Sequence, residues 1–354
     1  KALGSYLRLA TVPVAEGVMG HCLRGRESML VRDVGAHESM EGLQYGPGVE
    51  AMLAPVRHAG RELGVLAVAR DHGGGSFTVN DMDVFRSLAE QSAFALGNSM
   101  VHREAGEKRR MVRELRVARH VQQVLLPEED PDLVGYRVYG TNVPARIISG
   151  DYYDYIPLED GSLGVAIADV SGKGVSAGLM MATCRSALRA AVTGVSPAEA
   201  LAVVNRQLFP DMREDMFISM AYLILENGSG RLTMARAGHD APLMYRKATQ
   251  EIEVLKPGGL ALGVDEGPVF ERVTLDFEAS FESGDCLLLY TDGVNEALNG
   301  DEEEFGRDRM LEAFRKAAPM GGEEVVKVLQ REVEEFVGDN PQMDDITLIA
   351  IEKR

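Results

Sequence analysis

Short motifs that contain aspartate stand at or near the ends of predicted strands. They are Ser149-Gly150-Asp151, Ala168-Asp169-Val170, Thr291-Asp292-Gly293 and Asp344-Asp345-Ile346-Thr347. An aspartate side chain is short, so a strand end holds its carboxylate in few rotamers. Carboxylates that converge in one pocket repel one another and raise one another's pKa unless cations lie between them. The motifs therefore indicate a cation site.

Ligands that are all oxygen atoms suit Mg²⁺ or Mn²⁺, whereas zinc usually takes His or Cys. A pair of such ions can share a water, lower its pKa and direct it at a phosphorus atom. Each motif alone is a weak indication, because Asp-Gly is a common turn and Asp-Asp before a strand can be an edge device. Their combination and order are much more specific.

The elements that must position these motifs are strands and helices predicted after Pro127. Strands are predicted over residues 136–142, 163–170, 219–226, 231–237, 286–291 and 346–352. Helices are predicted over residues 175–191, 197–208 and 323–337. Because the strands are not interleaved one for one with helices, antiparallel sheets flanked by helices fit better than a doubly wound parallel sheet. The whole chain is expected to be α+β.

Longer segments around the motifs follow one another in a specific order. They are Ser149-Gly150-Asp151-Tyr152-Tyr153-Asp154, Ala168-Asp169-Val170-Ser171-Gly172-Lys173-Gly174, Gly238-His239-Asp240-Ala241-Pro242, Tyr290-Thr291-Asp292-Gly293 and Asp344-Asp345-Ile346-Thr347-Leu348. In this order they resemble the bacterial SpoIIE/RsbU-like branch of the PPM metal-dependent protein phosphatases, and Leu125-Leu126-Pro127 is similar to the entry sequence of that domain. The resemblance covers about residue 121 to the C-terminus. It implies an αββα sandwich over residues 127–354, a site for two Mn²⁺ or Mg²⁺ ions, and a phosphoserine or phosphothreonine protein as substrate. Such substrates are often small anti-anti-sigma (STAS) domains that control a sigma factor.

Carried over residue by residue, the resemblance also implies the metal ligands. Asp169 would bridge both ions, and the Val170 carbonyl would bind the first. Asp292 and Asp344 would hold the second ion, and Asp151 would serve the first directly or through water. Asp169 and Asp292 are thereby the expected catalytic residues, because they hold the ions that activate the water.

Other residues near these motifs are expected to support the ligands. Asp154 lies three residues beyond Asp151, and Gly293 follows Asp292. Asp345 is expected to support the ligands and not to bind an ion, because many relatives have Asn in its place. Arg146 stands where relatives outside this branch have a phosphate-binding arginine. A solvent-exposed arginine is the favoured interpretation there, because arginines are mostly on the surface.

Two further features of this region have a structural interpretation that outweighs the functional one. Ser171-Gly172-Lys173-Gly174 lacks the spacing of a P-loop, so its glycines are expected to let the chain turn into the next helix. His239 is a candidate general acid, but its cluster with glycine and proline is more typical of a turn. No histidine metal site is proposed.

Residues 1–97 are predicted as a separate α/β domain. Short alternating segments over residues 28–33, 51–57 and 64–70 predict strands, and Asn80 is a candidate N-cap for an amphipathic helix over residues 81–97. The central strand, the segment Phe77-Thr78-Val79-Asn80-Asp81 and the end of the helix resemble a GAF domain, which implies a sensor for a small-molecule or protein signal. Cys22 beside His21 is interpreted as a packed thiol and not as a tetrapyrrole or redox site. Since the chain opens at Lys1 without Met, and the domain lacks the family's first helix, a fragment of a longer protein is expected.

Residues 98–126 are predicted as a linker helix. Met111, Leu115, Ala118, Gln122 and Leu125 step by 4, 3, 4 and 3 residues, the spacing of a coiled coil. The helix is therefore expected to couple the two domains and to mediate a homodimer. The alternative is a passive, solvated spacer, because short runs of this kind also occur on ordinary amphipathic helices.

Composition limits the possible partners. The formal net charge of −18 argues against nucleic-acid binding, which needs a basic surface. The three cysteines are interpreted as buried free thiols in a reducing cytoplasm, and no apolar run is long enough to cross a membrane in this fragment. The alternatives to an active phosphatase are a catalytically silent signalling scaffold of the same fold, or a metal-dependent phosphodiesterase or nuclease. The presence of all principal acidic positions counts against the first, and the acidic composition counts against the second.

Overall fold

The computed structural model describes residues 17–37, 48–71 and 75–354. The chain divides into two compact units, Lys1–Val112 and Arg113–Arg354. One helix, α2 (Val79–Gln123), begins in the first unit and ends in the second. The two helical segments predicted over residues 81–97 and 98–126 therefore join into one helix of 45 residues.

The first unit is a small antiparallel sheet covered on both faces. Its elements are α1 (Gly17–Gly25), β1 (Met29–Val31), β2 (Val49–His58) and β3 (Arg61–Asp71), with strand order β1-β2-β3. Alternate residues of β2 face opposite sides, so Ala51 and Leu53 pack with α1 while Met52 and Ala54 pack with the start of α2. The three predicted strands are confirmed, and α1 is an element that the sequence analysis missed.

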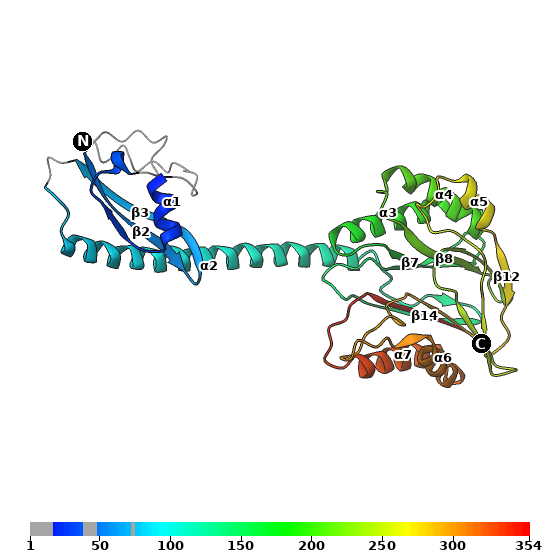
Figure 1. Cartoon of the computed structure of the whole chain (residues 1–354). Coiled ribbons are helices and arrows are strands. Elements are labelled where there is room, and N and C mark those ends of the chain that lie inside the picture. Colours follow the sequence, from blue (N-terminus) through cyan, green and yellow to red (C-terminus); the bar gives the residue numbers. More distant parts are fainter. Residues whose placement is uncertain (1–16, 38–47, 72–74) are drawn as a thin grey trace. The chain divides into compact units, whose positions relative to one another are not determined.

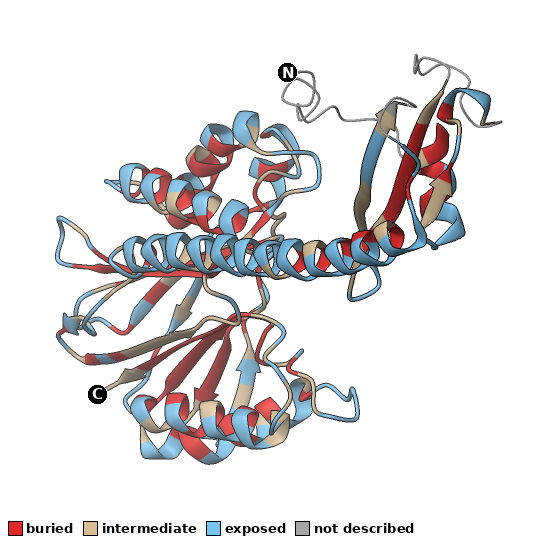
Figure 2. Cartoon of the chain, turned by 90° about the vertical axis from the view of Figure 1, so that its left-hand side faces the viewer, coloured by how far each residue is buried: buried red, intermediate tan, exposed pale blue. Residues whose placement is uncertain are grey.

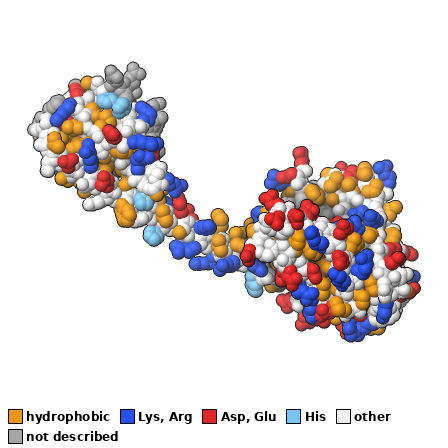
Figure 3. All heavy atoms as spheres, turned by 60° about the horizontal axis from the view of Figure 1, so that its bottom comes forward, with side chains coloured by type: hydrophobic (Ala, Val, Ile, Leu, Met, Phe, Trp, Pro, Cys, Tyr) orange, Lys and Arg blue, Asp and Glu red, His pale blue; other side chains and the backbone are white. Residues whose placement is uncertain are grey.

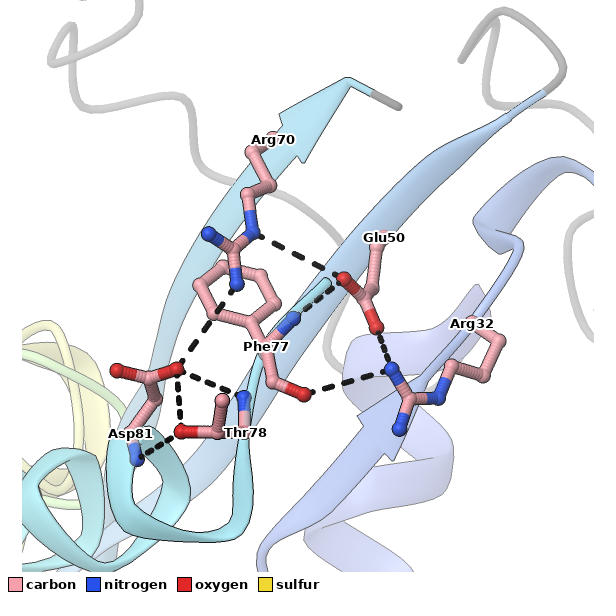
Figure 4. Close-up of polar contacts among 6 residues, drawn as sticks. All are labelled: Arg32, Glu50, Arg70, Phe77, Thr78 and Asp81. Carbon is pink, nitrogen blue, oxygen red and sulfur yellow. Dashed lines mark hydrogen bonds and ion pairs between the residues drawn. The ribbon is translucent and has the colours of Figure 1, made fainter. Parts of the chain in front are cut away.

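The buried carboxylate of Glu50 joins the sheet of this unit to the segment before α2 (Figure 4). It accepts the backbone N–H of Phe77 at 2.8 Å and forms an ion pair with Arg32. Arg70 lies 3.8 Å from the same carboxylate, and its guanidinium stacks 3.6 Å from the centre of the Phe77 ring. Because a buried charge is stable only with such partners, these contacts fix where α2 begins.

The first turn of α2 is capped by Thr78 and not by the predicted Asn80. The Thr78 hydroxyl accepts the N–H of Asp81 at 3.2 Å, and the Asp81 carboxylate accepts the N–H of Thr78 at 2.7 Å. This reciprocal pair is the arrangement of a capping box, with Asp in place of the usual Glu. The prediction for Asn80 was wrong because several polar residues in a row are all acceptable caps by type.

The second unit is a sandwich of two antiparallel sheets between two layers of helices (Figure 1). The first sheet has the order β11-β10-β13-β14-β5-β4, and the second has the order β12-β9-β8-β7-β6. The strands of the first sheet are β4 (Asp132–Leu133), β5 (Tyr136–Val143), β10 (Leu243–Arg246), β11 (Glu251–Val254), β13 (Cys286–Tyr290) and β14 (Ile346–Lys353). Those of the second are β6 (Tyr152–Pro157), β7 (Leu163–Val170), β8 (Ile218–Leu225), β9 (Arg231–Ala237) and β12 (Phe277–Ser280). The expected αββα sandwich is confirmed.

The helices lie on the outer faces of the two sheets (Figure 1). The second sheet packs against α3 (Val175–Ala191) and α4 (Pro197–Leu208), with α5 (Pro268–Val273) beside α4. The first sheet packs against α6 (Gly306–Ala317) and α7 (Gly322–Val337). The predicted helices are confirmed, whereas α5, α6 and the strands β4, β6, β10, β11 and β12 were not predicted.

Strand β7 shows how apolar side chains fill the core and where a carboxylate lies at the edge of the sandwich. Val165 and Ile167 face the core between the sheets, while Ala166, Ala168 and Val170 pack toward the helices. A strand buried on both faces has a nearly continuous apolar sequence. Asp169 falls in the series that faces between the sheets, and it stands where the strand ends. The alternation of side chains along β7 therefore places the Asp169 carboxylate at the edge of the sandwich.

The burial of the cysteines agrees with the sequence analysis. All three cysteines, Cys22, Cys184 and Cys286, are free and buried. No helix in the described residues is long and apolar enough to cross a membrane. Residues 101–110, in the middle of α2, are exposed, and much of the ribbon of this helix is pale blue in Figure 2. Lys and Arg side chains gather along the helix (Figure 3).

Candidate metal centre

The aspartate motifs come together at one edge of the sandwich. Asp151 stands just before β6 and Asp169 lies near the end of β7, and these strands are antiparallel neighbours with Tyr152 opposite Ala168. In the other sheet, Asp292 follows β13 and Asp344 precedes β14, which are again antiparallel neighbours. In an antiparallel pair the end of one strand lies beside the start of the next. Each sheet therefore contributes two carboxylates to the same edge.

Asp151 links the two sheets through hydroxyl groups. Its Oδ2 accepts hydrogen bonds from Thr291 Oγ1 at 2.9 Å and from Thr347 Oγ1 at 2.5 Å, and the residue is 1% exposed. Both threonines belong to the first sheet region, whereas Asp151 leads into the second. Both threonines stand within the aspartate motifs, but their residue type alone did not indicate this role.

Asp345 holds the loop that leads to Asp151. One of its oxygens accepts the N–H of Ala145 at 2.7 Å. The other accepts the Ser149 hydroxyl at 2.8 Å and the N–H of Gly150 at 2.7 Å. These three donors occupy the carboxylate, so Asp345 supports the loop while its neighbour Asp344 is free of these contacts.

Two glycines allow backbone segments to approach closely at this edge. A Cβ atom on Gly293 would lie 2.0 Å from the Asp345 carbonyl oxygen. A Cβ atom on Gly150 would lie 3.0 Å from the Val170 carbonyl oxygen and 3.6 Å from Asp169 Oδ1. The space beside the two predicted ligands Asp169 and Val170 is therefore kept open by the absence of a side chain on Gly150.

Burial and mutual repulsion raise the pKa values of the clustered carboxyl groups. Burial, followed by repulsion from Asp292 and Asp344, raises the pKa of Asp169 to about 7. Burial and the nearby Asp169 raise the pKa of Asp151 well above its ordinary value. The pKa of Asp292 is raised by burial and by Asp344. Such shifts arise when carboxylates share a low-dielectric site without a compensating charge.

Several charged residues near the cluster had no assigned role in the sequence analysis. The ammonium group of Lys173 lies 2.7 Å from Asp344 Oδ2 and donates to the Met343 carbonyl at 2.8 Å. In the sequence, Lys173 stands out only through its resemblance to a phosphate loop. Asp240 and Glu296 are close enough to Asp292 for mutual repulsion to raise pKa values. Asp240 was visible in the sequence as the neighbour of His239, but neither spacing nor type distinguished it from a turn residue.

The donor set fits a hard divalent cation that retains water ligands. Within the described residues, no three Asp, Glu, His or Cys side chains are arranged to hold one ion by themselves. Mg²⁺ commonly binds through one or two carboxylates and keeps several waters, so a complete protein cage is not required. The available donors are carboxylates from four strand ends and the Val170 carbonyl beside Gly150. They are all oxygen atoms, as Mg²⁺ and Mn²⁺ prefer.

Three further candidates lie outside this cluster or do not face it. Asp154 is 1% exposed and accepts two hydrogen bonds from Arg189 of α3, each at 2.7 Å, so it joins β6 to α3 instead of contacting the other aspartates. Arg146 is exposed on the loop before β6. His239 is 3% exposed, burial lowers its pKa to about 4, and its Nδ1 lies 2.8 Å from the Ser219 hydroxyl. A neutral, buried imidazole favours the structural role over the general acid.

Comparisons with known proteins show which families the two parts of the chain resemble. The model of the SpoIIE family, described as stage II sporulation protein E, matches residues 159–354, and the GAF domain model matches residues 4–97. Phosphoserine phosphatase RsbU of Bacillus subtilis (strain 168) is 29% identical over 279 residues, which cover 77% of this chain and 81% of that protein.

Solved structures show the same fold. The SiaA-PP2C domain of Pseudomonas aeruginosa has a TM-score of 0.60 at 22% identity, covering 71% of this chain and 100% of that one. The RsbU and RsbW domains of a Mycobacterium tuberculosis protein have a TM-score of 0.53 at 26% identity, covering 63% of this chain and 61% of that one. Since the SpoIIE model matches more than half of the residues, and the sandwich with its aspartate-bearing edge agrees with that match, the chain belongs to the SpoIIE family and carries a GAF domain before its PP2C-type phosphatase fold.

Proposed function

We propose that this chain is a protein phosphatase that hydrolyses phosphoserine or phosphothreonine in a partner protein and requires Mn²⁺ or Mg²⁺. The observation that carries the proposal is the meeting of Asp151, Asp169, Asp292 and Asp344 at one edge of the sandwich, where burial and then repulsion raise the pKa of Asp169 to about 7. A site of this kind stabilises bound cations. Membership of the SpoIIE family and the likeness to phosphoserine phosphatase RsbU support phosphoprotein hydrolysis over a silent scaffold or a phosphodiesterase.

The residues have distinct proposed roles. Asp169 and Asp292 would be the principal ligands of two ions, and Asp151, the Val170 carbonyl and Asp344 would help to hold them. When bound, such ions lower the pKa of water and stabilise the charge that develops on a phosphoryl group. Asp345 and Gly293 position the ligand loops through the contacts described above. Asp154 acts at a distance, by holding α3 against β6.

The substrate proposed is a small regulatory phosphoprotein of the STAS type, whose dephosphorylation would be controlled through the GAF domain. Support comes from the domain order, in which a sensor precedes the phosphatase on a continuous helix. The formal net charge of −18 does not favour a nucleic-acid substrate.

The first prediction concerns the metal requirement. Hydrolysis of p-nitrophenyl phosphate and of a phosphoserine protein should stop in excess EDTA and return on addition of Mn²⁺ or Mg²⁺, because the proposed ligands hold the ions that activate water. No phosphate should be found covalently attached to the protein after a quenched turnover. Full activity in EDTA, or a trapped phosphoenzyme, would contradict the mechanism.

The second prediction concerns Asp169. Asp169→Asn should lower turnover by orders of magnitude while raising the melting temperature of the metal-free protein at about pH 8. The folded-state pKa of Asp169, about 7, lies above its ordinary value. Ionisation of Asp169 therefore destabilises the metal-free fold as the pH rises from that ordinary value to above about 7. The gain in stability should therefore shrink as the pH falls to about 4, where the carboxyl group is protonated in the folded state and only partly ionised in the unfolded state. Scanning calorimetry at both pH values checks this, and near-normal activity of the variant would show that the site is assigned wrongly.

The third prediction concerns the close approach at Gly293. Gly293→Ala would bring a Cβ atom 2.0 Å from the Asp345 carbonyl oxygen, so the Asp344–Asp345 segment must move. We expect at least a tenfold weaker apparent affinity for Mn²⁺, since displaced supporting groups typically cost about 10–100-fold. Gly300→Ala is the matched control, because a Cβ atom there meets nothing within 4 Å. Equal Mn²⁺ affinities for the two variants would refute a supporting role of Gly293.

We also propose that α2 mediates a homodimer, but through residues other than those predicted from the sequence. Gln122 is only 8% exposed and therefore not available to a second copy, and Leu125 is half-buried. Val117, Val121 and Val124 are instead 63%, 60% and 61% exposed and again step by 4 and 3 residues. Exposed valines at this spacing suit a coiled-coil contact.

The fourth prediction tests this dimer. Val121→Asp should convert the dimer to a monomer in light scattering, because it places two like charges at the contact between the helices. Gln123→Asp is the control, since it introduces the same side chain on the same exposed turn but on another side of the helix. A wild-type protein that is monomeric, or a Val121→Asp variant of unchanged mass, would favour the passive spacer.

A further inference from the structure

The last turn of α2 places a buried amide against the loop that leads to the metal centre. Gln122 Nε2 donates to the Ser149 carbonyl at 2.7 Å, and Gln122 Oε1 accepts the Ser149 N–H at 3.0 Å. Gln122 is 8% exposed, whereas the neighbouring Gln123 is exposed. A primary amide that pairs with both backbone groups of one residue fixes that residue in position and orientation, and its loss would leave a buried donor and acceptor unpaired.

Ser149 in turn positions two of the site aspartates. Its hydroxyl donates to Asp345 Oδ2 at 2.8 Å and accepts the N–H of Asp151 at 3.0 Å. The next residue, Gly150, donates its N–H to the same Asp345 oxygen at 2.7 Å and faces the Val170 carbonyl. A displacement of Ser149 would therefore move Asp151 and close or widen the space beside Val170.

The surroundings of Gln122 leave little room for another arrangement. A Cβ atom on Gly178 of α3 would lie 3.2 Å from Gln122 Nε2 and 2.3 Å from Ile148. Leu126, four residues after Gln122, packs against the core beneath α3 and against the core between the sheets. A helix advances by about 100° per residue, so a shift of α2 by one position would present Val121 or Gln123 and break the two hydrogen bonds with Ser149.

We propose that Gln122 is a positioning residue for the metal centre, which acts through Ser149 and sets the affinity of the Asp151 side of the site for the catalytic cation. The inference rests on the proposed metal-dependent phosphatase function. It assigns to the end of α2 a direct physical effect on the site, because any signal that turns or unwinds this last turn must break the Gln122–Ser149 pair. The coupling lies wholly within the phosphatase unit.

The experiment compares Gln122→Met with Gln123→Met in the full chain. Methionine keeps the length of the side chain and its helix propensity but removes both hydrogen bonds. Mn²⁺ affinity is measured by titration calorimetry, hydrolysis of p-nitrophenyl phosphate is followed over a range of Mn²⁺ concentrations, and hydrogen exchange is measured over residues 145–151. Gln122→Met should weaken Mn²⁺ binding by about 10–100-fold, raise the half-saturating Mn²⁺ concentration equally, and leave kcat at saturating Mn²⁺ within a few-fold of the wild type.

Loss of protection over residues 145–151 in the metal-free Gln122→Met protein, with Gln123→Met like the wild type, supports the proposal. Unchanged Mn²⁺ affinity in Gln122→Met overturns it, and so does a fall in kcat alone with unchanged half-saturation. If Gln122→Met does not fold, Gln122→Glu is used, which keeps the acceptor for the Ser149 N–H and loses the donor, and binding as tight as in the wild type then overturns the proposal. Failure of the wild-type protein itself to bind Mn²⁺ or hydrolyse the substrate would instead reject the proposed function, and the inference with it.

Discussion

Repulsion among carboxylates at one edge of the sandwich is the constraint on which the rest of the phosphatase unit depends. Asp151, Asp169, Asp292 and Asp344 lie close enough for burial and mutual repulsion to raise pKa values within the group. Most of the contacts that hold the loops of this group come from neutral donors, and the ammonium group of Lys173 lies beside Asp344. Threonine hydroxyls bind Asp151, and backbone N–H groups bind Asp345. The cluster is therefore fixed in place yet short of positive charge, which is the condition that favours cation binding.

The sandwich supplies this arrangement because both sheets end at the same edge. Strands buried on both faces need apolar side chains almost throughout, so a carboxylate without a cationic partner is tolerated only at a strand end, as with Asp169 in β7. The helix α3 starts directly after the loop that follows Val170, and α2 ends against the loop that precedes Asp151. Two helices thus lie next to the loops that carry Val170 and Asp151, so a movement of either helix would change the geometry of the site.

The sequence was sufficient to predict the elements whose patterns are strong. Doubly buried strands such as β7 and β14 have apolar runs, and the aspartates at the end of β7 and just before β14 stand out for that reason. Strand β6, with sequence YYDYIP, was missed because its buried Asp154 breaks the pattern, and only the fold shows that Arg189 neutralises it. The short edge strands β11 and β12 alternate between exposed and half-buried residues and contain too few of them to show a period.

Roles within the site were harder to predict than its location. Asp344 and Asp345 are adjacent and identical in type, yet their contacts differ. Asp344 forms an ion pair with Lys173, whereas Asp345 accepts hydrogen bonds from Ser149 and Gly150. Gln122 fits a coiled-coil spacing as well as Leu115 does, because a spacing of 3 and 4 residues states which side chains share a face but not what covers that face. These distinctions depend on contacts between residues far apart in the chain.

The central claim is that the aspartate cluster holds divalent cations. Anomalous diffraction at the manganese edge from crystals grown with Mn²⁺ tests it most directly, because the anomalous signal locates the ions independently of activity. The account predicts manganese peaks in contact with Asp169, one also near Asp151 and the Val170 carbonyl and one near Asp292 and Asp344. The absence of manganese at this edge under saturating Mn²⁺, or its binding at other residues only, would contradict the account.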